Sequence, residues 1–397
     1  MPETLAFVIP WHGPGIAGGA EAECRATARA LAARGLSVEI LATCARDHAS
    51  PWADHYPEGP DEADGLAVRR FKVRPRDPER YARYDWRLKR GGSLSPLEEQ
   101  NFVRDSIHSA DLYAYLAAER SRYWYAFIPY CFGTTWEGVL AAPDRALLIP
   151  CLHDEAYAYL GATARALRAA RAVCLHVPAE RRLAERLAGG DPGSFVLVGE
   201  GVDTGGTGDA ARFREKYRIA EPFLLYAGRK AQEKNTPLLV EYYARYRFTH
   251  PDSPLKLVLI GGGGIRIPER LGRDVRDLGF VPAQDKLDAY AACVALCQPS
   301  LLESFSIVMM EAWLCGAPAL VHAGCAVTRD HCLAGNGGLF FGEYFEFVEA
   351  VDLLLADAGL RRRLGENGRA YVLANFTWDR VTDNYLRLLR GLGARLS

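Results

Sequence analysis

Apolar stretches of strand length alternate with helical patterns along most of this 397-residue chain, and they do so in two successive runs. Apolar strands that are each followed by a helix are typical of parallel sheets covered on both faces. The glycine-rich residues 199–209 separate the two runs and are typical of a linker. We therefore expect an α/β protein with two Rossmann-like, doubly wound parallel-sheet domains, residues 1–200 and 201–375, facing each other across a ligand cleft.

The expected elements follow from the same pattern. In the first domain we expect strands at residues 5–9, 36–43, 67–73, 125–131, 146–151, 172–176 and 195–198. In the second we expect strands at "PFLLYAG", "LKLVLIGGGG", "VALCQPS" and "APALVHA", and helices at residues 237–246, 286–292, 304–315 and 345–357, with a terminal helix at 379–392.

Composition excludes several classes of protein. A net charge of −1 gives no overall attraction to nucleic acid or membrane, so we expect no nucleic-acid partner. No apolar stretch is long enough to span a bilayer, and the N-terminus lacks the basic start of a signal peptide. Ten cysteines occur without a C-x-x-C pair, which favours a reducing, cytoplasmic setting and no cysteine-rich zinc site.

The stretch "WHGPGIAGGAE" contains Gly13, Gly15 and Gly18 in the G-x-G-x-x-G spacing of dinucleotide-binding proteins. An NAD-dependent oxidoreductase is therefore one alternative. Three residues separate the strand from the first glycine, however, and Pro14 stiffens the turn. The acidic residue expected about twenty positions further on would be Glu39, which lies in the middle of an expected strand. We interpret the motif as a false positive.

Two segments of the second domain predict a diphosphate site. Glu303 follows a strand, Ser304 is a plausible N-cap of the next helix, and Glu311 lies two turns into that helix. A helix start after a parallel strand favours a phosphate, and a carboxylate deeper in the helix suits a ribose diol. In "YAGRKAQEKN", Gly228 lets the backbone approach a ligand, and two cations, Arg229 and Lys234, suit a diphosphate leaving group.

With "ESFSIVMMEAWLCGAP", "GRKAQEKN" resembles the retaining, nucleotide-sugar-dependent glycosyltransferases of the GT-B fold, in the large family of glycogen-synthase-like and bacterial cell-surface enzymes. The resemblance rests on the E-x7-E pair Glu303 and Glu311 with the upstream Arg and Lys, and it extends over nearly the whole chain. It implies transfer of a hexose-type sugar, with retention, from a nucleoside diphosphate sugar to a glycan or lipid-linked acceptor in polysaccharide synthesis. It also implies that residues 376–397 form a helix packing toward the first domain.

The resemblance assigns roles to individual residues. Arg229 and Lys234 would hold the diphosphate, Glu303 would contact the transferred sugar and Glu311 the ribose. His153, after a first-domain strand, would touch the sugar or acceptor; capping of the next helix is its structural alternative. Other donor contacts fall at Gly18, Gly19, Gly228, Val281, Ser304, Phe305, Ser306 and Ile307, and Ser306 stands where the family commonly has Gly. No D-x-D occurs, so we expect no metal and no cofactor besides the donor co-substrate.

Residues 69–92 are densely basic, with Tyr81, Tyr84 and Trp86 interleaved. Such a segment suits an anionic acceptor or peripheral contact with a membrane, while an arginine-rich surface loop paired to neighbouring acids is the simpler alternative. Two further functions remain open: a glycosidase, which would leave Arg229 and Lys234 without a role, and a non-catalytic sugar-nucleotide-binding protein.

Overall fold

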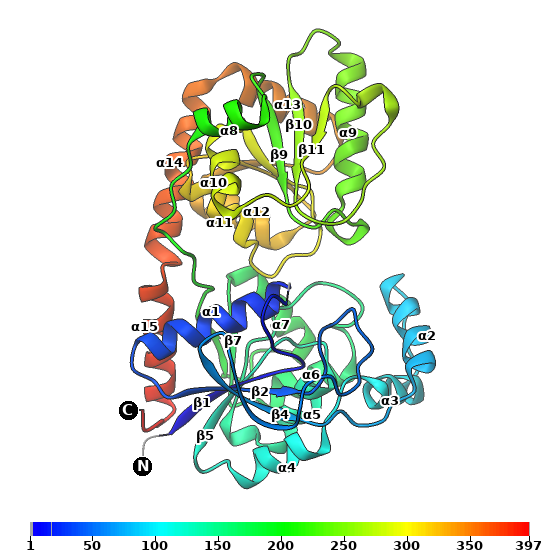
Figure 1. The fold of residues 1–397 in the computed structure, drawn as a ribbon, viewed down its shortest axis with the longest axis vertical. Coiled ribbons are helices and arrows are strands. Elements are labelled where there is room, and N and C mark those ends of the chain that lie inside the picture. Colours follow the sequence, from blue (N-terminus) through cyan, green and yellow to red (C-terminus); the bar gives the residue numbers. More distant parts are fainter. Residues whose placement is uncertain (1–2, 17, 397) are drawn as a thin grey trace. The chain divides into compact units, whose positions relative to one another are not determined.

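A computed structural model of the protein describes residues 3–16 and 18–396, which form two compact units (Figure 1). The first unit contains the chain up to Gly201 and again from Trp378 onward, and the second contains Val202–Thr377. Each unit is an open sheet with helices on its faces. The predicted fold class, two α/β units built on parallel sheets, is confirmed.

The first unit is built on an eight-stranded sheet in the order β3-β4-β2-β1-β5-β6-β7-β8. All neighbours pair in parallel except β3 and β4, which are antiparallel at one edge. Its strands are β1 (Thr4–Ile9), β2 (Val38–Thr43), β3 (Gly59–Ala63), β4 (Leu66–Phe71), β5 (Tyr123–Phe127), β6 (Ala146–Leu148), β7 (Ala172–Leu175) and β8 (Phe195–Leu197). Its helices are α1 (Gly19–Ala33), α2 (Pro78–Lys89), α3 (Pro96–Asp105), α4 (Ala110–Ala118), α5 (Gly133–Ala141), α6 (Gly161–Ala169), α7 (Pro178–Ala188) and α15 (Trp378–Gly391), with a 3-10 turn at Pro143–Arg145.

The second unit is built on a six-stranded parallel sheet in the order β11-β10-β9-β12-β13-β14. Its strands are β9 (Phe223–Ala227), β10 (Lys256–Ile260), β11 (Val275–Asp277), β12 (Ala295–Gln298), β13 (Ala319–His322) and β14 (Gly338–Phe341). Its helices are α8 (Ala210–Tyr217), α9 (Thr236–Thr249), α10 (Ala283–Ala292), α11 (Ile307–Leu314), α12 (Ala326–Gly335), α13 (Tyr344–Ala356) and α14 (Ala358–Asn375), with 3-10 turns at Gln232–Lys234 and Glu269–Leu271.

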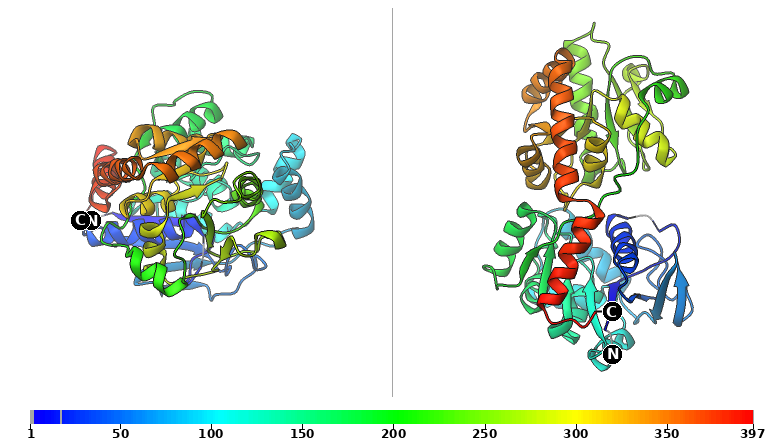
Figure 2. Two further views of the ribbon diagram at one scale, coloured as in Figure 1. Left: turned by 90° about the horizontal axis from the view of Figure 1, so that it is seen from above. Right: turned by 90° about the vertical axis from the view of Figure 1, so that its left-hand side faces the viewer.

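Successive side chains in the strands of the first sheet point to opposite faces of the sheet, because a strand repeats every two residues. Phe7 packs with α1 and α15 on one face, while its neighbour Val8 packs with α4, α5 and α6 on the other. In α15, Val381, Tyr385 and Leu389 recur every four residues and join the first of these cores. Figure 2 shows α15 lying along the first unit, beside α1.

The structure also differs from the sequence prediction. Residues 69–92, whose simpler reading was a surface loop, form the end of β4 and helix α2. Asp77 caps α2 by accepting a hydrogen bond from the Arg80 N–H at 2.9 Å, and Pro78 begins the helix. Only Leu88 of α2 is fully buried, and Tyr81 and Tyr84 on the same helix face pack against the core of the first unit while partly exposed.

No helix within the described residues is long and apolar enough to cross a membrane.

Candidate donor site in the second unit

The segment between β12 and α11 carries the E-x7-E pair. The buried ring of Phe305 packs edge-on against His331 and Phe376 and holds this segment in place. Helix α11 begins at Ile307 and not at residue 304, so the prediction that Ser304 is the N-cap is wrong. The chain between Glu303 and Ser306 is instead a loop held by Phe305, and the aromatic packing of that side chain sets where the helix starts.

Ser306 is the residue that precedes α11, and its backbone is left-handed, with φ of 73°. This conformation is unfavourable for any residue with a Cβ, which gives a physical reason for the Gly common at this position in the resembling family. The first N–H groups of α11, those of Ile307 and Val308, donate no hydrogen bond within the described chain. Free N–H groups at the positive end of a helix favour an anion such as a phosphate.

Glu303 and Lys234, predicted to act together, are in contact. The Lys234 ammonium lies 2.8 Å from Glu303 Oε1, and the Gln298 amide donates to the same oxygen at 3.0 Å. The Glu303 side chain is only 9% exposed. Lys234 comes from the 3-10 turn after β9 and Gln298 from the end of β12, so two neighbouring strands position this pair at their carboxyl ends.

Glu311, the predicted ribose ligand, lies in α11 and has two partners that the sequence analysis did not identify. Lys286 forms an ion pair with Glu311 Oε1 at 2.7 Å, and the Tyr290 hydroxyl donates to Oε2 at 3.0 Å. Burial and the neighbouring Glu311 carboxylate raise the pKa of Tyr290 well above its ordinary value, so Tyr290 stays a donor. Both partners lie on α10, four residues apart and therefore on one helix face.

The loop after β9 places the second predicted cation. Arg229 is exposed, and its carbonyl accepts a hydrogen bond from the Tyr226 hydroxyl at 2.8 Å. Gly228 has φ of 150° and a side chain at Gly261 would collide with its carbonyl oxygen, so glycines let these two loops pack closely.

Lys230, which the sequence analysis did not single out, is buried in the same loop. Its ammonium donates to the Gly261 carbonyl and, at 2.9 Å, to Asp277. This lysine therefore stabilises the loop and is not available to a ligand. Val281 lies just before α10, next to Phe280, whose ring is 85% exposed beside Gly262.

The remaining predicted residues belong to the first unit. Gly18 precedes α1 and Gly19 is its first residue, while the nearby Trp11 indole donates to Glu21 at 2.6 Å. His153 follows β6, with its Nδ1 3.5 Å from Glu155. Glu39 lies within β2 and accepts a hydrogen bond from the Tyr123 hydroxyl at 2.8 Å, which leaves it unsuited to hold a ribose.

One group among the described residues has the ligand types of a metal site: Glu23, Cys151 and His176, all buried in the first unit. His176 Nε2 lies 2.6 Å from Glu23 Oε1, and the Cys151 thiol donates to Glu23 at 3.2 Å. Glu180 lies 3.2 Å from the other ring nitrogen of His176 and also accepts the Leu152 N–H at 2.8 Å. Hydrogen bonds to Glu23 thus join Cys151 and His176, and Glu180 is placed to form an ion pair with the same imidazole.

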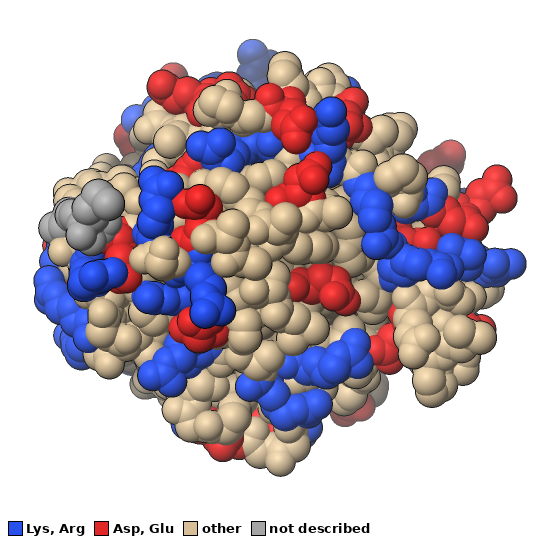
Figure 3. Space-filling view, turned by 90° about the horizontal axis from the view of Figure 1, so that it is seen from below, with Lys and Arg blue, Asp and Glu red and all other residues tan. Residues whose placement is uncertain are grey.

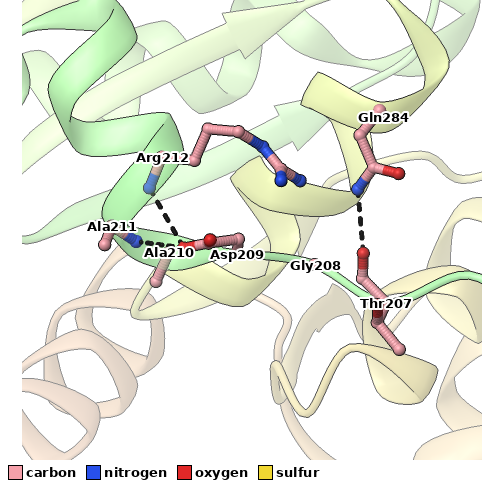
Figure 4. A pocket seen from close by; sticks show the side chains of 7 residues that line it. All are labelled: Thr207, Gly208, Asp209, Ala210, Ala211, Arg212 and Gln284. Carbon is pink, nitrogen blue, oxygen red and sulfur yellow. Dashed lines mark hydrogen bonds between the residues drawn. The ribbon is translucent and has the colours of Figure 1, made fainter.

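A pocket at the start of α8 is a different candidate for a ligand (Figure 4). Asp209 caps this helix by accepting from the N–H groups of Ala211 and Arg212, and Gln284 donates to the Thr207 carbonyl at 2.8 Å. The Arg212 guanidinium forms an ion pair with Asp288. With these donors occupied, the pocket offers no free charge to a phosphate.

Comparison with known proteins finds a family match within the second unit. Residues 209–371 match the family described as Glycosyl transferases group 1. D-inositol 3-phosphate glycosyltransferase of Stackebrandtia nassauensis is 26% identical over 94% of this chain and 87% of its own length. Among solved structures, sucrose-phosphate synthase from Thermosynechococcus elongatus superposes with a TM-score of 0.73 at 20% identity over 99% of both chains. Anabaena HepE in complex with UDP and glucose superposes with a TM-score of 0.67 at 16% identity, over 98% of this chain and 100% of that one.

The fold is that of the GT-B glycosyltransferases, two Rossmann-like units in one chain. The family match covers residues 209–371, most of the second unit.

Proposed function

We propose that this protein transfers a hexose-type sugar from a nucleoside diphosphate sugar to an acceptor hydroxyl, with retention of configuration. The observation that carries the proposal is the arrangement at the carboxyl ends of β9 and β12. There Lys234 is paired with Glu303, and the start of α11 offers free N–H groups. One turn further along α11 lies Glu311.

The donor is held by groups of matching chemistry. Glu311 accepts hydrogen bonds from the ribose hydroxyls, the N–H groups of Ile307 and Val308 bind the diphosphate, and Arg229 and Lys234 neutralise it. Val281 and its neighbours contact the base through the backbone. The UDP-bound structure of HepE supports a uridine donor as the first to test.

The transfer step requires stabilisation of the charge that develops on the diphosphate. The acceptor hydroxyl is the nucleophile, and no nucleophilic side chain of the protein is needed. The bond between the anomeric carbon and the diphosphate oxygen breaks, and its electron pair leaves with the nucleoside diphosphate. The acceptor oxygen forms the new bond on the same face, and its proton passes to the departing phosphate oxygen. One well-placed donor to the developing charge is worth roughly 3 kcal/mol, so Arg229, Lys234 and the helix start suffice without a metal.

The acceptor is proposed to be a hydroxyl compound that carries a phosphate. The names of the inositol-phosphate and sucrose-phosphate relatives support a small phosphorylated polyol or sugar. A lipid-linked glycan of cell-surface synthesis presents the same phosphate chemistry, and contact of residues 69–92 with the cytoplasmic face of a membrane would accompany it. Assays with both kinds of acceptor distinguish them. His153 is proposed to contact the sugar or this acceptor from the first unit.

Donor binding and turnover of two variants test the proposal. We expect UDP-, GDP- or ADP-sugars to raise the melting temperature of the wild type, because a ligand that binds only the folded state stabilises it. Glu311→Ala should weaken binding of the nucleoside diphosphate about tenfold, since a charge-assisted bond to the ribose is lost. Glu303→Gln should lower kcat more than it changes donor affinity.

Glu349→Ala, which removes an exposed carboxylate of α13, is the matched control and should change neither value. If no nucleoside diphosphate sugar shifts the melting temperature, the proposed function is wrong. If donor binds and no acceptor is glycosylated, the non-catalytic sugar-nucleotide-binding alternative holds instead.

A further inference from the structure

The side chain of Ser306 has no role in the proposed function, which uses only backbone N–H groups at this position. The residue is 6% exposed, and its hydroxyl has no hydrogen-bond partner among the described residues. A serine that precedes a helix normally accepts a hydrogen bond from the first turn. Ser306 does not, because its left-handed backbone, with φ of 73° and ψ of 66°, turns the side chain out of the capping position.

In the ligand-free protein, a serine at position 306 destabilises the folded state in two ways. A buried hydroxyl without a partner loses its hydration and gains nothing in return. A left-handed backbone with a Cβ is strained, and glycine would remove both disadvantages at once. A residue that lowers stability in two ways at a functional site points to a use that the ligand-free chain does not show.

The surroundings of Ser306 define what would use it. The backbone around it is fixed by the buried Phe305 ring on one side and by α11 on the other. A second buried polar atom of the same region, Oε1 of Gln298, also has no hydrogen-bond partner among the described residues. The free N–H groups of Ile307 and Val308 adjoin Ser306, and Glu303, paired with Lys234, lies three residues before it. In sequence the serine falls between the residue proposed for the sugar and the residue proposed for the ribose, where the diphosphate belongs.

We propose that the Ser306 hydroxyl, turned about its Cα–Cβ bond, donates a hydrogen bond to the diphosphate of the bound donor. This inference rests on the proposed function and adds a positioning group to it. The hydroxyl joins the N–H groups of Ile307 and Val308 as a third donor, and it is one that a glycine at this position cannot supply. Binding of the diphosphate gives the buried hydroxyl the partner that it lacks in the ligand-free chain.

Two variants separate the hydroxyl from the backbone. Ser306→Ala removes only the hydroxyl and keeps the left-handed strain, and Ser306→Gly removes both. The expected result is a melting temperature equal to or above that of the wild type for both variants, with Ser306→Gly the higher. Calorimetric titration with UDP should show about tenfold weaker binding for both, the effect of one lost charge-assisted hydrogen bond. Uridine, which has no phosphate, should bind all three proteins equally.

Ser194→Ala is the matched control, because the buried hydroxyl of Ser194, in the first unit, also has no hydrogen-bond partner in the described part of the chain. It should raise the melting temperature and leave UDP binding unchanged. UDP binding by Ser306→Ala at wild-type strength overturns the inference while leaving the proposed function intact. Equal weakening of UDP and uridine also overturns it, since the hydroxyl would then act on the loop and not on the phosphates. Failure of the wild type to bind UDP, GDP or ADP overturns both.

Discussion

At the scale of single residues, the donor site is a set of paired charges and not a bare basic patch. Lys234 is bound to Glu303 and Lys286 to Glu311, so only Arg229 stands exposed and without an ion pair among the described residues. The site therefore has one more cation than carboxylate. In the proposed function, binding of a diphosphate draws Lys234 partly away from Glu303. The freed carboxylate is then available to the sugar hydroxyls.

Two buried histidines of the first unit predict how stability depends on pH. Burial lowers the pKa of both His12 and His108 to about 4, so both are neutral in the folded protein. In the unfolded chain each takes up a proton near pH 6.5. Their contribution to stability is therefore lost as the pH falls from about 6.5 toward 4.

The variant His12→Gln tests this prediction. It removes one of the two groups, and the loss of unfolding free energy between pH 7 and pH 5 should shrink by about 2 kcal/mol relative to the wild type. Denaturant unfolding at the two pH values measures the difference. His55→Gln, at an exposed position of the same unit, should leave the loss unchanged. An equal loss in wild type and His12→Gln would show that the pKa of His12 is the same in the folded and the unfolded chain.

His176 has the opposite effect. The carboxylates of Glu23 and Glu180 raise its pKa well above the ordinary value despite burial. Its contribution to stability is complete below about pH 6.5 and is lost as the pH rises through the folded-state pKa. The first unit is therefore destabilised at low pH by His12 and His108 and at high pH by the deprotonation of His176.

At the scale of elements, α2 and the residue that follows it carry both paired and unpaired basic side chains. Arg80 is paired with Asp105, Arg87 with Glu98 and Lys89 with Asp85. Arg83 and Arg90 have no ion pair among the described residues, and Arg90 lies over the ring of Trp86, which is 59% exposed. On the face drawn in Figure 3, basic side chains lie among acidic and uncharged ones, so that face presents no continuous basic field.

We expect Arg83 and Arg90 to meet the phosphate of the acceptor. Replacing both by Ser should raise the acceptor KM several-fold and leave the donor Kd unchanged, because the donor groups lie in the second unit. Lys89→Ser is the control, since the Lys89 charge is already taken up by Asp85. A change in donor affinity alone would contradict this assignment. Co-sedimentation of the wild type with anionic but not neutral vesicles would show contact with an anionic membrane surface, as a lipid-linked acceptor requires.

The sequence predicted most elements because their signals are local. Each strand expected in the first unit is present, since an apolar run bounded by turn residues is sufficient evidence for a buried strand. The edge strand β3 was missed because Pro60, Asp61 and Glu62 are all exposed, and a proline followed by two acidic residues gives no apolar run. The start of α11 was misplaced because the packing of Phe305 against His331 and Phe376 decides it, and those contacts are distant in sequence.

The same reasoning applies to the site. Lys234 and Glu303 were predicted from motif spacing and are in contact. Lys286 and Tyr290 were not predicted as partners of Glu311, because nothing in the sequence shows that α10 packs against α11. Amphipathic periodicity would have placed Tyr290 in the core, but its hydroxyl partner depends on the fold. Pairing across elements is the information that a single sequence lacks.

At the scale of the whole molecule, the residues proposed to bind the donor and the one cluster of possible metal ligands among the described residues belong to different units. The donor groups lie in the second unit, and Glu23, Cys151 and His176 lie in the first. No D-x-D occurs in the 397 residues, and in the proposed function Arg229, Lys234 and the start of α11 supply the positive charge that a diphosphate requires. We therefore expect transferase activity to survive treatment with EDTA, with kcat and KM for the donor unchanged.

The measurement that checks this is an initial-rate assay before and after chelation, with the melting temperature recorded in parallel. Activity that is abolished by EDTA and restored by magnesium or manganese would contradict the metal-independent transfer, because those ions bind oxygen ligands at a diphosphate. A fall in melting temperature that zinc alone reverses, and that Cys151→Ser abolishes, would instead locate a structural ion in the first unit. Cys151 and His176 are both bound to Glu23 without an ion, so we expect no change in either measurement.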